Sequence, residues 1–186
     1  AAYGLNSNID SRCGAIANVN WPGITITAAQ SVPARTFTPP GSKDSLTDLP
    51  AFCRVAAVLK PTPDSNIKIE LWMPVKNWNG RFLGTGNGGG AGKIRYNFLA
   101  DGIRRGYATA NTDMGTSPNA DEVIGHPERW ADFGYRSTHE MTVTSKKILT
   151  RYYQKTQSRS YFVGCSTGGQ QALMEAYFGV VMIRGY

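Results

Sequence analysis

The segment from Gly164 to Gly168 (GCSTG) has the clearest chemical potential, because it is a G-x-S-x-G pattern. It lies between a predicted strand at 160–164 and a predicted helix at 170–176, which is the context of a nucleophile elbow. Such a turn strains the nucleophile and leaves no room for side chains at the two outer positions, which are glycines here. Ser166 is therefore the candidate nucleophile, and the backbone N–H of Thr167 is a candidate oxyanion donor. A strand-to-helix turn without chemistry is the alternative.

A second glycine-rich segment runs from Gly84 to Gly92 (GTGNGGGAG), directly after a predicted strand. In an α/β-hydrolase, the loop after the third strand supplies the other oxyanion donor from a backbone N–H. Gly88 and Gly89 lie at the matching place, and the lack of side chains would let the backbone approach a substrate. This segment therefore predicts an oxyanion loop.

The same glycines support a rival interpretation. Gly84, Gly86 and Gly89 match G-x-G-x-x-G, and Asp113 ends the next predicted strand 24 residues after Gly89 (113 − 89). A ribose-binding acid lies at about that distance in dinucleotide-binding modules. The alternative function is therefore a Rossmann-like module using the run from Gly84 to Gly89 and Asp113. It leaves the G-x-S-x-G pattern unexplained, whereas an ester hydrolase uses both features.

The chain has few residues that could act as the general base for Ser166. Triad members of this fold follow the order Ser, acid, His, but only 20 residues (186 − 166) follow Ser166. They contain Glu175, which we expect to point away from the site, and no histidine. Of the two histidines, His139 is expected to be structural and His126 exposed. The chain therefore cannot complete its own triad, and we expect it to be inactive alone.

The predicted elements change character along the chain. The first half reads as antiparallel strands joined by hairpins, the last through the Asn79-Gly80 turn. The stretch 81–177 then alternates strand and helix, which indicates a parallel sheet. One helix is expected to begin with a capping box formed by Ser137 and Glu140. The predicted strands are 24–28, 54–60, 67–73, 81–84, 107–111 and 160–164, the strand at 67–73 being half-buried.

Composition excludes several classes. The chain has 186 residues and a net charge of +7, but its cations are scattered and no nucleic-acid-reading motif accompanies them. No apolar run approaches the roughly 20 residues that span a bilayer. Three cysteines, Cys13, Cys53 and Cys165, include no C-x-x-C pair, which argues against zinc. A Cys13–Cys53 bridge would close a long loop, and three reduced thiols are the alternative.

Four segments carry a family resemblance: GNGGGAG at 86–92, RGYATANTDMG at 105–115, FGYRSTHEMT at 133–142 and GCSTGGQQALMEA at 164–176. In this order they resemble the tannase and feruloyl esterase family of secreted α/β-hydrolases, over roughly residues 50–176. The resemblance implies a serine esterase acting on gallate or hydroxycinnamate esters of plant polymers or polyphenols, located outside the cell or in the periplasm. It implies neither a nucleic-acid nor a membrane partner, and it does not give the oligomeric state.

The resemblance also implies roles for individual residues. Ser166 is the nucleophile by the family pattern, and Cys13 and Cys53 correspond to an amino-terminal bridge. Cys165 pairs in this family with a cysteine beside the catalytic histidine, and that partner is missing here.

What should follow the elbow in this family is a triad Asp, a His and a lid that usually binds calcium. None of these is present, so we expect a truncated α/β-hydrolase fold with no cofactor or metal in this segment. The expected parts are a loop-rich segment with short strands at 1–50, the amino-terminal part of the hydrolase domain at 51–176, and a tail at 177–186 that does not match the family.

Overall fold

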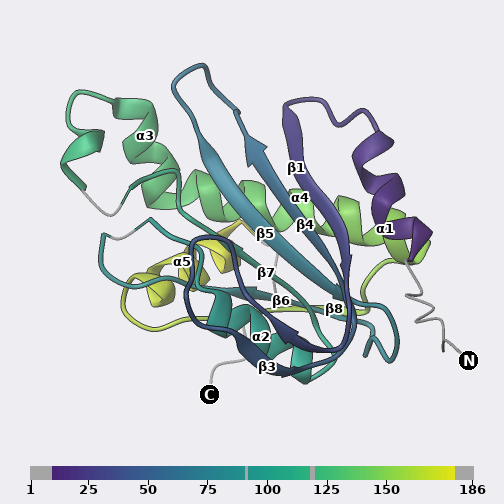
Figure 1. Ribbon diagram of the computed structural model, residues 1–186. Helices are drawn as coiled ribbons and strands as arrows, with labels where there is room; N and C mark the ends of the chain where they lie inside the picture. Colours follow the sequence, from purple (N-terminus) through teal and green to yellow (C-terminus); the bar gives the residue numbers. More distant parts are fainter. Residues whose placement is uncertain (1–9, 91, 118–119, 179–186) are drawn as a thin grey trace, which may run out of the picture.

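The computed structural model describes residues 10–90, 92–117 and 120–178, and a six-stranded sheet forms its centre (Figure 1). The strand order is β1-β4-β5-β7-β6-β8. The pairings β1–β4, β4–β5 and β5–β7 are antiparallel, whereas β6 pairs in parallel with β7 and β8. The predicted change from antiparallel to parallel strands is confirmed. The strands are β1 (Ile24–Val32), β4 (Phe52–Leu59), β5 (Ile67–Pro74), β6 (Arg81–Thr85), β7 (Ala108–Thr112) and β8 (Arg159–Val163).

Helices cover both faces of this sheet. The short α1 (Ser11–Ala15) and the long α4 (Ser137–Tyr153) pack against one face, and α5 (Thr167–Tyr177) lies beside α4. On the other face lie α2 (Tyr96–Arg104) and the hairpin of β2 (Arg35–Phe37) and β3 (Leu46–Leu49). Two apolar cores therefore sandwich the sheet. The remaining elements are η1 (Ile16–Asn18), η2 (Ala120–Val123), α3 (Pro127–Ala131) and a π-helical turn, η3 (Asp132–Arg136).

Strand β5 is buried on both faces, so its expected half-burial is wrong. Its alternating apolar residues, such as Ile69 and Leu71, pack into the core under α4, as the pattern predicts. Trp72 on the opposite face is also buried, because α2 and the β2–β3 hairpin cover it. The period-2 pattern did not reveal this second layer, because Lys68 and Glu70 occupy its polar positions and only Trp72 departs from it; Glu70 is buried in an ion pair with Arg54.

The prediction that the Asn79-Gly80 turn joins two paired strands is wrong. Gly80 does adopt a turn conformation, with φ of +75°. However, β6 does not pair with β5, because β7 lies between them. The backbone N–H of Asn79 donates to the carbonyl of Gly106 (3.0 Å), at the start of β7. The turn therefore carries the chain past the position that β7 occupies, and β6 receives parallel partners on both sides.

The predicted capping box at Ser137 is also wrong. Arg136, immediately before it, has helical φ and ψ (−64° and −40°), so the chain is already helical there. The hydroxyl of Ser137 is buried and has no hydrogen-bond partner among the described residues. Helical structure begins earlier, at Pro127, where a proline at the first helical position needs no N–H partner. The helix that contains Glu140, α4, therefore continues the helical stretch that begins at Pro127 and has no free amino-terminal end at Ser137.

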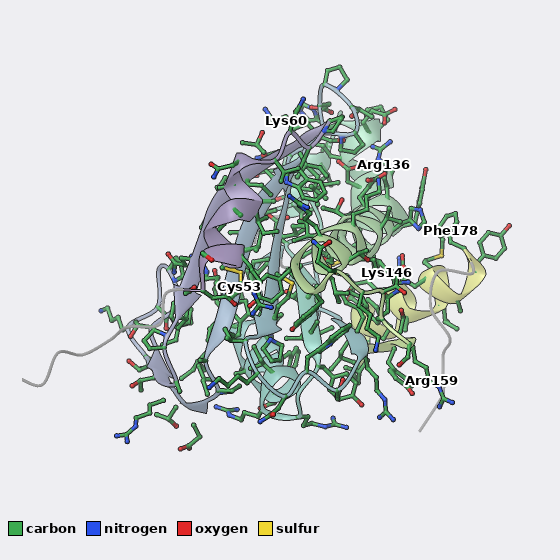
Figure 2. All side chains as sticks on the ribbon, turned by 90° about the vertical axis from the view of Figure 1, so that its right-hand side faces the viewer. Cys53, Lys60, Arg136, Lys146, Arg159 and Phe178 are labelled. Atoms are coloured by element: carbon green, nitrogen blue, oxygen red, sulfur yellow. A yellow bond between two sulfur atoms is a disulfide. The ribbon has the colours of Figure 1, made fainter. Side chains whose placement is uncertain are left out.

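A disulfide joins Cys13 in α1 to Cys53 in β4, with Cα atoms 5.5 Å apart (Figure 2). The pairing expected from the resemblance is confirmed. Cys165 is free and exposed.

None of the described helices combines the length and apolar character that a membrane crossing requires.

Candidate active site

Ser166 occupies a strained turn between β8 and α5. Its φ of 58° and ψ of −121° lie in a region that side-chain-bearing residues rarely adopt. The turn is too tight for side chains at its flanks, since a Cβ on Gly164 would lie 2.4 Å from the carbonyl carbon of Gly168. The Ser166 side chain is exposed. The glycines at both ends of the motif thus permit a conformation that presents this hydroxyl to solvent.

The glycine-rich segment after β6 packs directly against this turn. A Cβ on Gly86 would lie 2.5 Å from the Cα of Gly168, so the two backbones touch. The N–H of Gly86 donates to the carbonyl of Val163 (2.8 Å), and the N–H of Gly168 donates to the carbonyl of Asn87 (3.0 Å). Residues more than 75 positions apart are therefore held in backbone contact at the end of the sheet.

Asn87 and Gln171 fix this contact from inside. The Asn87 backbone N–H donates to Oε1 of buried Gln171 (2.8 Å), whose Nε2 donates to Thr138 Oγ1 (3.0 Å). The Asn87 side chain donates to the carbonyls of Lys93 (2.8 Å) and Thr112 (3.0 Å). Buried polar groups bonded in this way hold a single arrangement. The loop after β6 is thus tied to α5, α4 and β7 together.

Gly88 and Gly89 follow this anchor and face solvent more than Asn87 does. Gly89 has φ of +61°, and its carbonyl accepts a hydrogen bond from Thr167 Oγ1 (2.9 Å). Neither glycine N–H donates a backbone hydrogen bond to another described residue, nor does that of Thr167 at the start of α5. The structure therefore brings Gly89 into contact with Thr167, the residue after Ser166, and the role of these N–H groups as oxyanion donors stays a prediction.

No histidine lies beside Ser166. Nδ1 of exposed His126 lies 3.1 Å from Asp64, as part of a surface pair. Nδ1 of His139 on α4 lies 3.8 Å from Oε1 of Glu175. Glu175 is nine residues beyond Ser166, which corresponds to about 13 Å along α5. Both histidines thus match their expected structural or exposed positions.

Glu175 is fully buried between α5 and α4 and faces His139 and Lys146, away from the elbow. Burial raises the pKa of this carboxyl, while the hydroxyl of Thr142 and these two basic groups oppose the rise. Burial likewise lowers the pKa of Lys146. This far end of α5 therefore holds titratable groups in the interior without placing any of them at the nucleophile.

The residues of the dinucleotide alternative have structural tasks. A Cβ on Gly84 would lie 2.6 Å from the ring of Phe162, so this glycine serves sheet packing. Oδ1 of Asp113 accepts the backbone N–H groups of Lys68 and Gly115, both at 2.9 Å, and burial raises its pKa to about 6. This geometry gives the dinucleotide alternative no support. The described residues also contain no cluster of three or more His, Cys, Asp or Glu side chains that could hold a metal.

The strand order, the elbow after β8 and the glycine loop after β6 together define an α/β-hydrolase fold. The family model "Tannase and feruloyl esterase" matches residues 53–178. This chain belongs to the tannase and feruloyl esterase family.

Relatives and solved structures agree with this assignment. An "Uncharacterized esterase" of Xanthomonas campestris is 38% identical over 91% of this chain and 30% of its own length. A "Probable feruloyl esterase B-2" of Aspergillus terreus is 34% identical over 92% of this chain and 34% of its own. The crystal structure of feruloyl esterase B from Aspergillus oryzae superposes with a TM-score of 0.83 at 32% identity, covering 89% of this chain and 34% of that one. The chain thus spans about a third of the length of these relatives.

Sequence reasoning missed the residues that anchor the loop. Asn87 is a single side chain within a run of glycines, and Gln171 is a polar residue at a buried helical position. Both exceptions to the local pattern were signals that these side chains have specific partners.

Proposed function

We propose that this chain is the nucleophile-bearing part of a serine carboxylic-ester hydrolase that cleaves gallate or hydroxycinnamate esters. The observation that carries the proposal is the strained, exposed Ser166 between the glycines of the elbow, with the loop after β6 packed against it. In the reaction, Ser166 Oγ attacks the ester carbonyl carbon and a base takes its proton. The carbonyl oxygen becomes an oxyanion, and collapse of the intermediate expels the alcohol to leave an acyl-serine.

The oxyanion is held by backbone donors. The N–H of Thr167 points outward from the first turn of α5, where the helix end also favours negative charge. The N–H of Gly88 or Gly89 is the second donor, supported by the hydrogen bonds that fix Asn87 and Gly89. Because these amides are pre-positioned by backbone contact, they stabilise the developing charge without rearrangement.

The base and its orienting acid lie outside this sequence. Neither His126 nor His139 lies beside Ser166, so the chain alone leaves the hydroxyl a weak nucleophile. We therefore predict that the 186-residue chain has no esterase activity by itself. The disulfide between Cys13 and Cys53 fits an oxidising compartment, so we propose that the enzyme works outside the cell or in the periplasm.

The test uses the coding sequence beyond codon 186, searched for a Cys, an Asp and a His in the same frame, and the protein expressed from that longer frame. We expect it to hydrolyse methyl ferulate or methyl gallate and to lose at least 10³-fold in kcat in Ser166→Ala. Ser158→Ala is the matched control, because Ser158 lies in an exposed loop at the other end of β8. Hydrolysis that persists in Ser166→Ala contradicts the proposed function.

The 186-residue chain by itself tests the prediction that it has no esterase activity without a base from outside this sequence. Purified and assayed on methyl ferulate, it should show no Ser166-dependent turnover. Turnover that disappears in Ser166→Ala would show that the chain finds a base of its own, leaving the ester-hydrolase function in place.

A further inference from the structure

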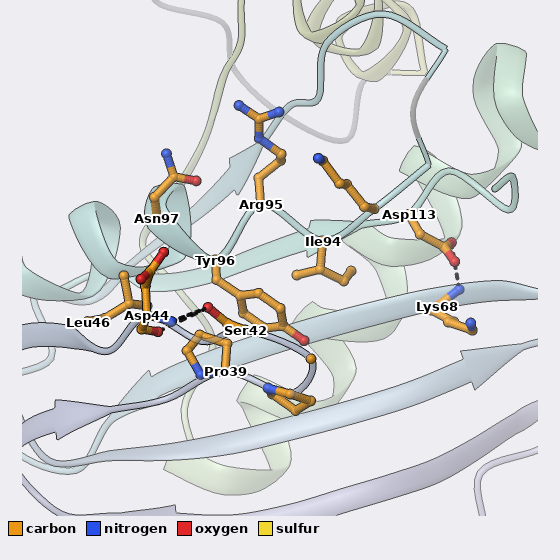
Figure 3. A pocket seen from close by; sticks show the side chains of 13 residues that line it. Pro39, Ser42, Asp44, Leu46, Lys68, Ile94, Arg95, Tyr96, Asn97 and Asp113 are labelled. Carbon is orange, nitrogen blue, oxygen red and sulfur yellow. Dashed lines mark hydrogen bonds between the residues drawn. The ribbon is translucent and has the colours of Figure 1, made fainter. Parts of the chain in front are cut away.

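A pocket of about 800 Å³ opens on the described part of the molecule, and Ser166 is not among the residues that line it (Figure 3). Three separate parts of the chain form it: residues 39–46, which lead from β2 into β3, residues 93–97, which lead into α2, and Lys68 in β5 together with Asp113 just after β7. The proposed chemistry at Ser166 uses none of these residues.

The pocket lies beside the carboxyl ends of the parallel strands, the end of the sheet at which Ser166 also lies. Asp113 follows the carboxyl end of β7, and its N–H donates to the carbonyl of Lys68 at the start of antiparallel β5. Ligands of α/β sheets bind at the carboxyl ends of the parallel strands. Two strand spacings, about 10 Å, separate β7 from β8, while the carbonyl of pocket residue Lys93 accepts a hydrogen bond from Asn87 in the loop beside the elbow (2.8 Å). A group bound beside Asp113 would therefore belong to a part of the substrate about two strand spacings from the reacting carbonyl.

Tyr96, Ile94 and Pro39 contribute apolar surface to the pocket (Figure 3). The hydroxyl of Tyr96 donates to Oε1 of Glu70 (3.3 Å), which is buried and ion-paired with Arg54. Burial and the charge of Glu70 together raise the pKa of Tyr96 to about 12. A tyrosine ring held in this way offers a fixed face on which the C–H side of a sugar ring can pack.

The rim carries positive charge. Lys68, Lys93 and Arg95 line the pocket, and none of the three forms an ion pair with another described residue. Two carboxylates also line it, those of Asp44 and Asp113. Asp113 accepts two backbone N–H groups, is 5% exposed and attracts the charge of Lys68, so the lining holds three cationic side chains against two carboxylates. The lining therefore favours a ligand with a carboxylate near Lys68 and Lys93.

We propose that this pocket binds an acidic sugar unit, a hydroxyl-bearing ring with a carboxylate, in the alcohol part of the ester. The ring packs on Tyr96, and its carboxylate lies against Lys68 and Lys93. This inference rests on the proposed function for its place in the substrate, but the binding itself does not require Ser166. The enzyme would then prefer esters of acidic polysaccharides over esters of neutral ones or of methanol.

The test is a titration of the 186-residue chain with trigalacturonate, and with xylotriose as the neutral comparison, followed by calorimetry. We expect trigalacturonate to bind at least tenfold more tightly, and its affinity to fall severalfold when NaCl is raised from 0.05 to 0.5 M. Lys68→Gln and Tyr96→Ala should each weaken binding at least fivefold. Tyr96→Phe keeps the ring and should bind nearly as tightly as the parent chain.

Two controls make the result specific. Lys60→Gln changes an exposed lysine outside the pocket and should leave affinity unchanged. Circular dichroism spectra of Lys68→Gln and Tyr96→Ala matching the parent chain would show that a loss of affinity is not a loss of folding. Absence of binding to either sugar, equal binding of both, or equal weakening by Lys60→Gln and Lys68→Gln overturns the proposal.

The Ser166→Ala variant separates this inference from the proposed function. It should bind trigalacturonate as the parent chain does. If the chain binds no trigalacturonate but the longer protein shows Ser166-dependent hydrolysis, the proposal of sugar binding is rejected and the proposed esterase function stands.

Discussion

The two edges of the sheet are held in different ways. At the β1 edge, α1 is covalently attached through Cys13 and Cys53, and Asp10 joins Arg12 and the hydroxyl of Tyr152. The hydrogen bond from Arg12 holds the pKa of Asp10 below its usual range. Side chains from distant parts of the sequence therefore fasten this edge.

At the β8 edge, direct backbone contact holds the elbow, and the buried side chains of Asn87 and Gln171 support it from inside. The elbow rests on Gly86 and Gly168, with no space for even a methyl group between them. Outside this contact, large apolar side chains face solvent: Val163 is 54% exposed, Leu173 69% and Tyr177 83%. The comparison indicates that the nucleophile is presented by a closely packed region that no disulfide holds within the described residues. Small steric changes there should have larger effects than the loss of a covalent bond at the other edge.

The largest effect is expected from Gly164→Ala. The new Cβ would lie 2.4 Å from backbone atoms of Gly168, and backbone cannot move aside as a flexible side chain can. We expect the free energy of unfolding in urea to fall by about 5 kcal/mol. Gly169→Ala is the matched control, because a Cβ there meets nothing within 4 Å, and it should stabilise α5 by up to about 1 kcal/mol. Similar free energies of unfolding for the two variants would mean that the elbow has room for a side chain at position 164.

Removing the disulfide should come next. The bridge spans 40 residues, and the chain-entropy relation gives a loss of about 4 kcal/mol for the double variant Cys13→Ala/Cys53→Ala. Urea unfolding of the oxidised parent and of this variant measures the difference. Cys165→Ala is the control, because its free thiol closes no loop. A loss larger than that of Gly164→Ala would reverse the ranking of the two edges.

A smaller loss is expected from Gln171→Ala, which leaves the Asn87 N–H and the Thr138 hydroxyl without their shared partner. The cost should be about 2 kcal/mol in the free energy of unfolding. Gln170→Ala changes the exposed neighbour, whose Nε2 donates to the carbonyl of Gly134, and should cost under about 0.5 kcal/mol. Equal losses would show that the buried network does not fasten the loop.

The smallest effect concerns Glu175 and depends on pH. Because burial raises the pKa of this carboxyl in the folded chain, the folded state binds a proton that the unfolded chain has released. The free energy of unfolding therefore falls as pH rises from the ordinary carboxyl range through the raised value. Glu175→Gln should stabilise the chain at pH 7 by about 1 kcal/mol and have little effect near pH 4.

Thermal melts at both pH values measure this difference. The exposed Glu122→Gln serves as control and should change little at either pH. A stabilisation by Glu175→Gln that is the same at both pH values would contradict the role of the buried carboxyl.

Local sequence patterns predicted the parts of the site that depend on neighbouring residues. The glycines around Ser166 indicated the strained turn, and the glycine run indicated a loop without side chains. The alternation of strand and helix after residue 81 indicated parallel strands. In each case the physical cause, backbone sterics or periodic burial, lies within a few residues of the motif.

What escaped prediction depends on segments that are distant in sequence. The Asn79-Gly80 turn does not reveal that β7 will insert beside β5, because that pairing is decided by residues 30 positions later. Ser137 and Glu140 match a capping box, yet Pro127 had already begun the helical stretch. The pocket proposed to bind a sugar combines residues 39–46 with residues 93–97, and neither stretch carries a motif.

The unpaired cysteine makes the elbow accessible to spectroscopy. Since Cys13 and Cys53 are joined, Cys165 is the single thiol of the chain that a maleimide dye can reach, and it lies next to Ser166. A fluorophore could therefore be attached beside the nucleophile without any mutagenesis. Its emission and anisotropy would report directly when another polypeptide segment or a ligand covers this part of the surface.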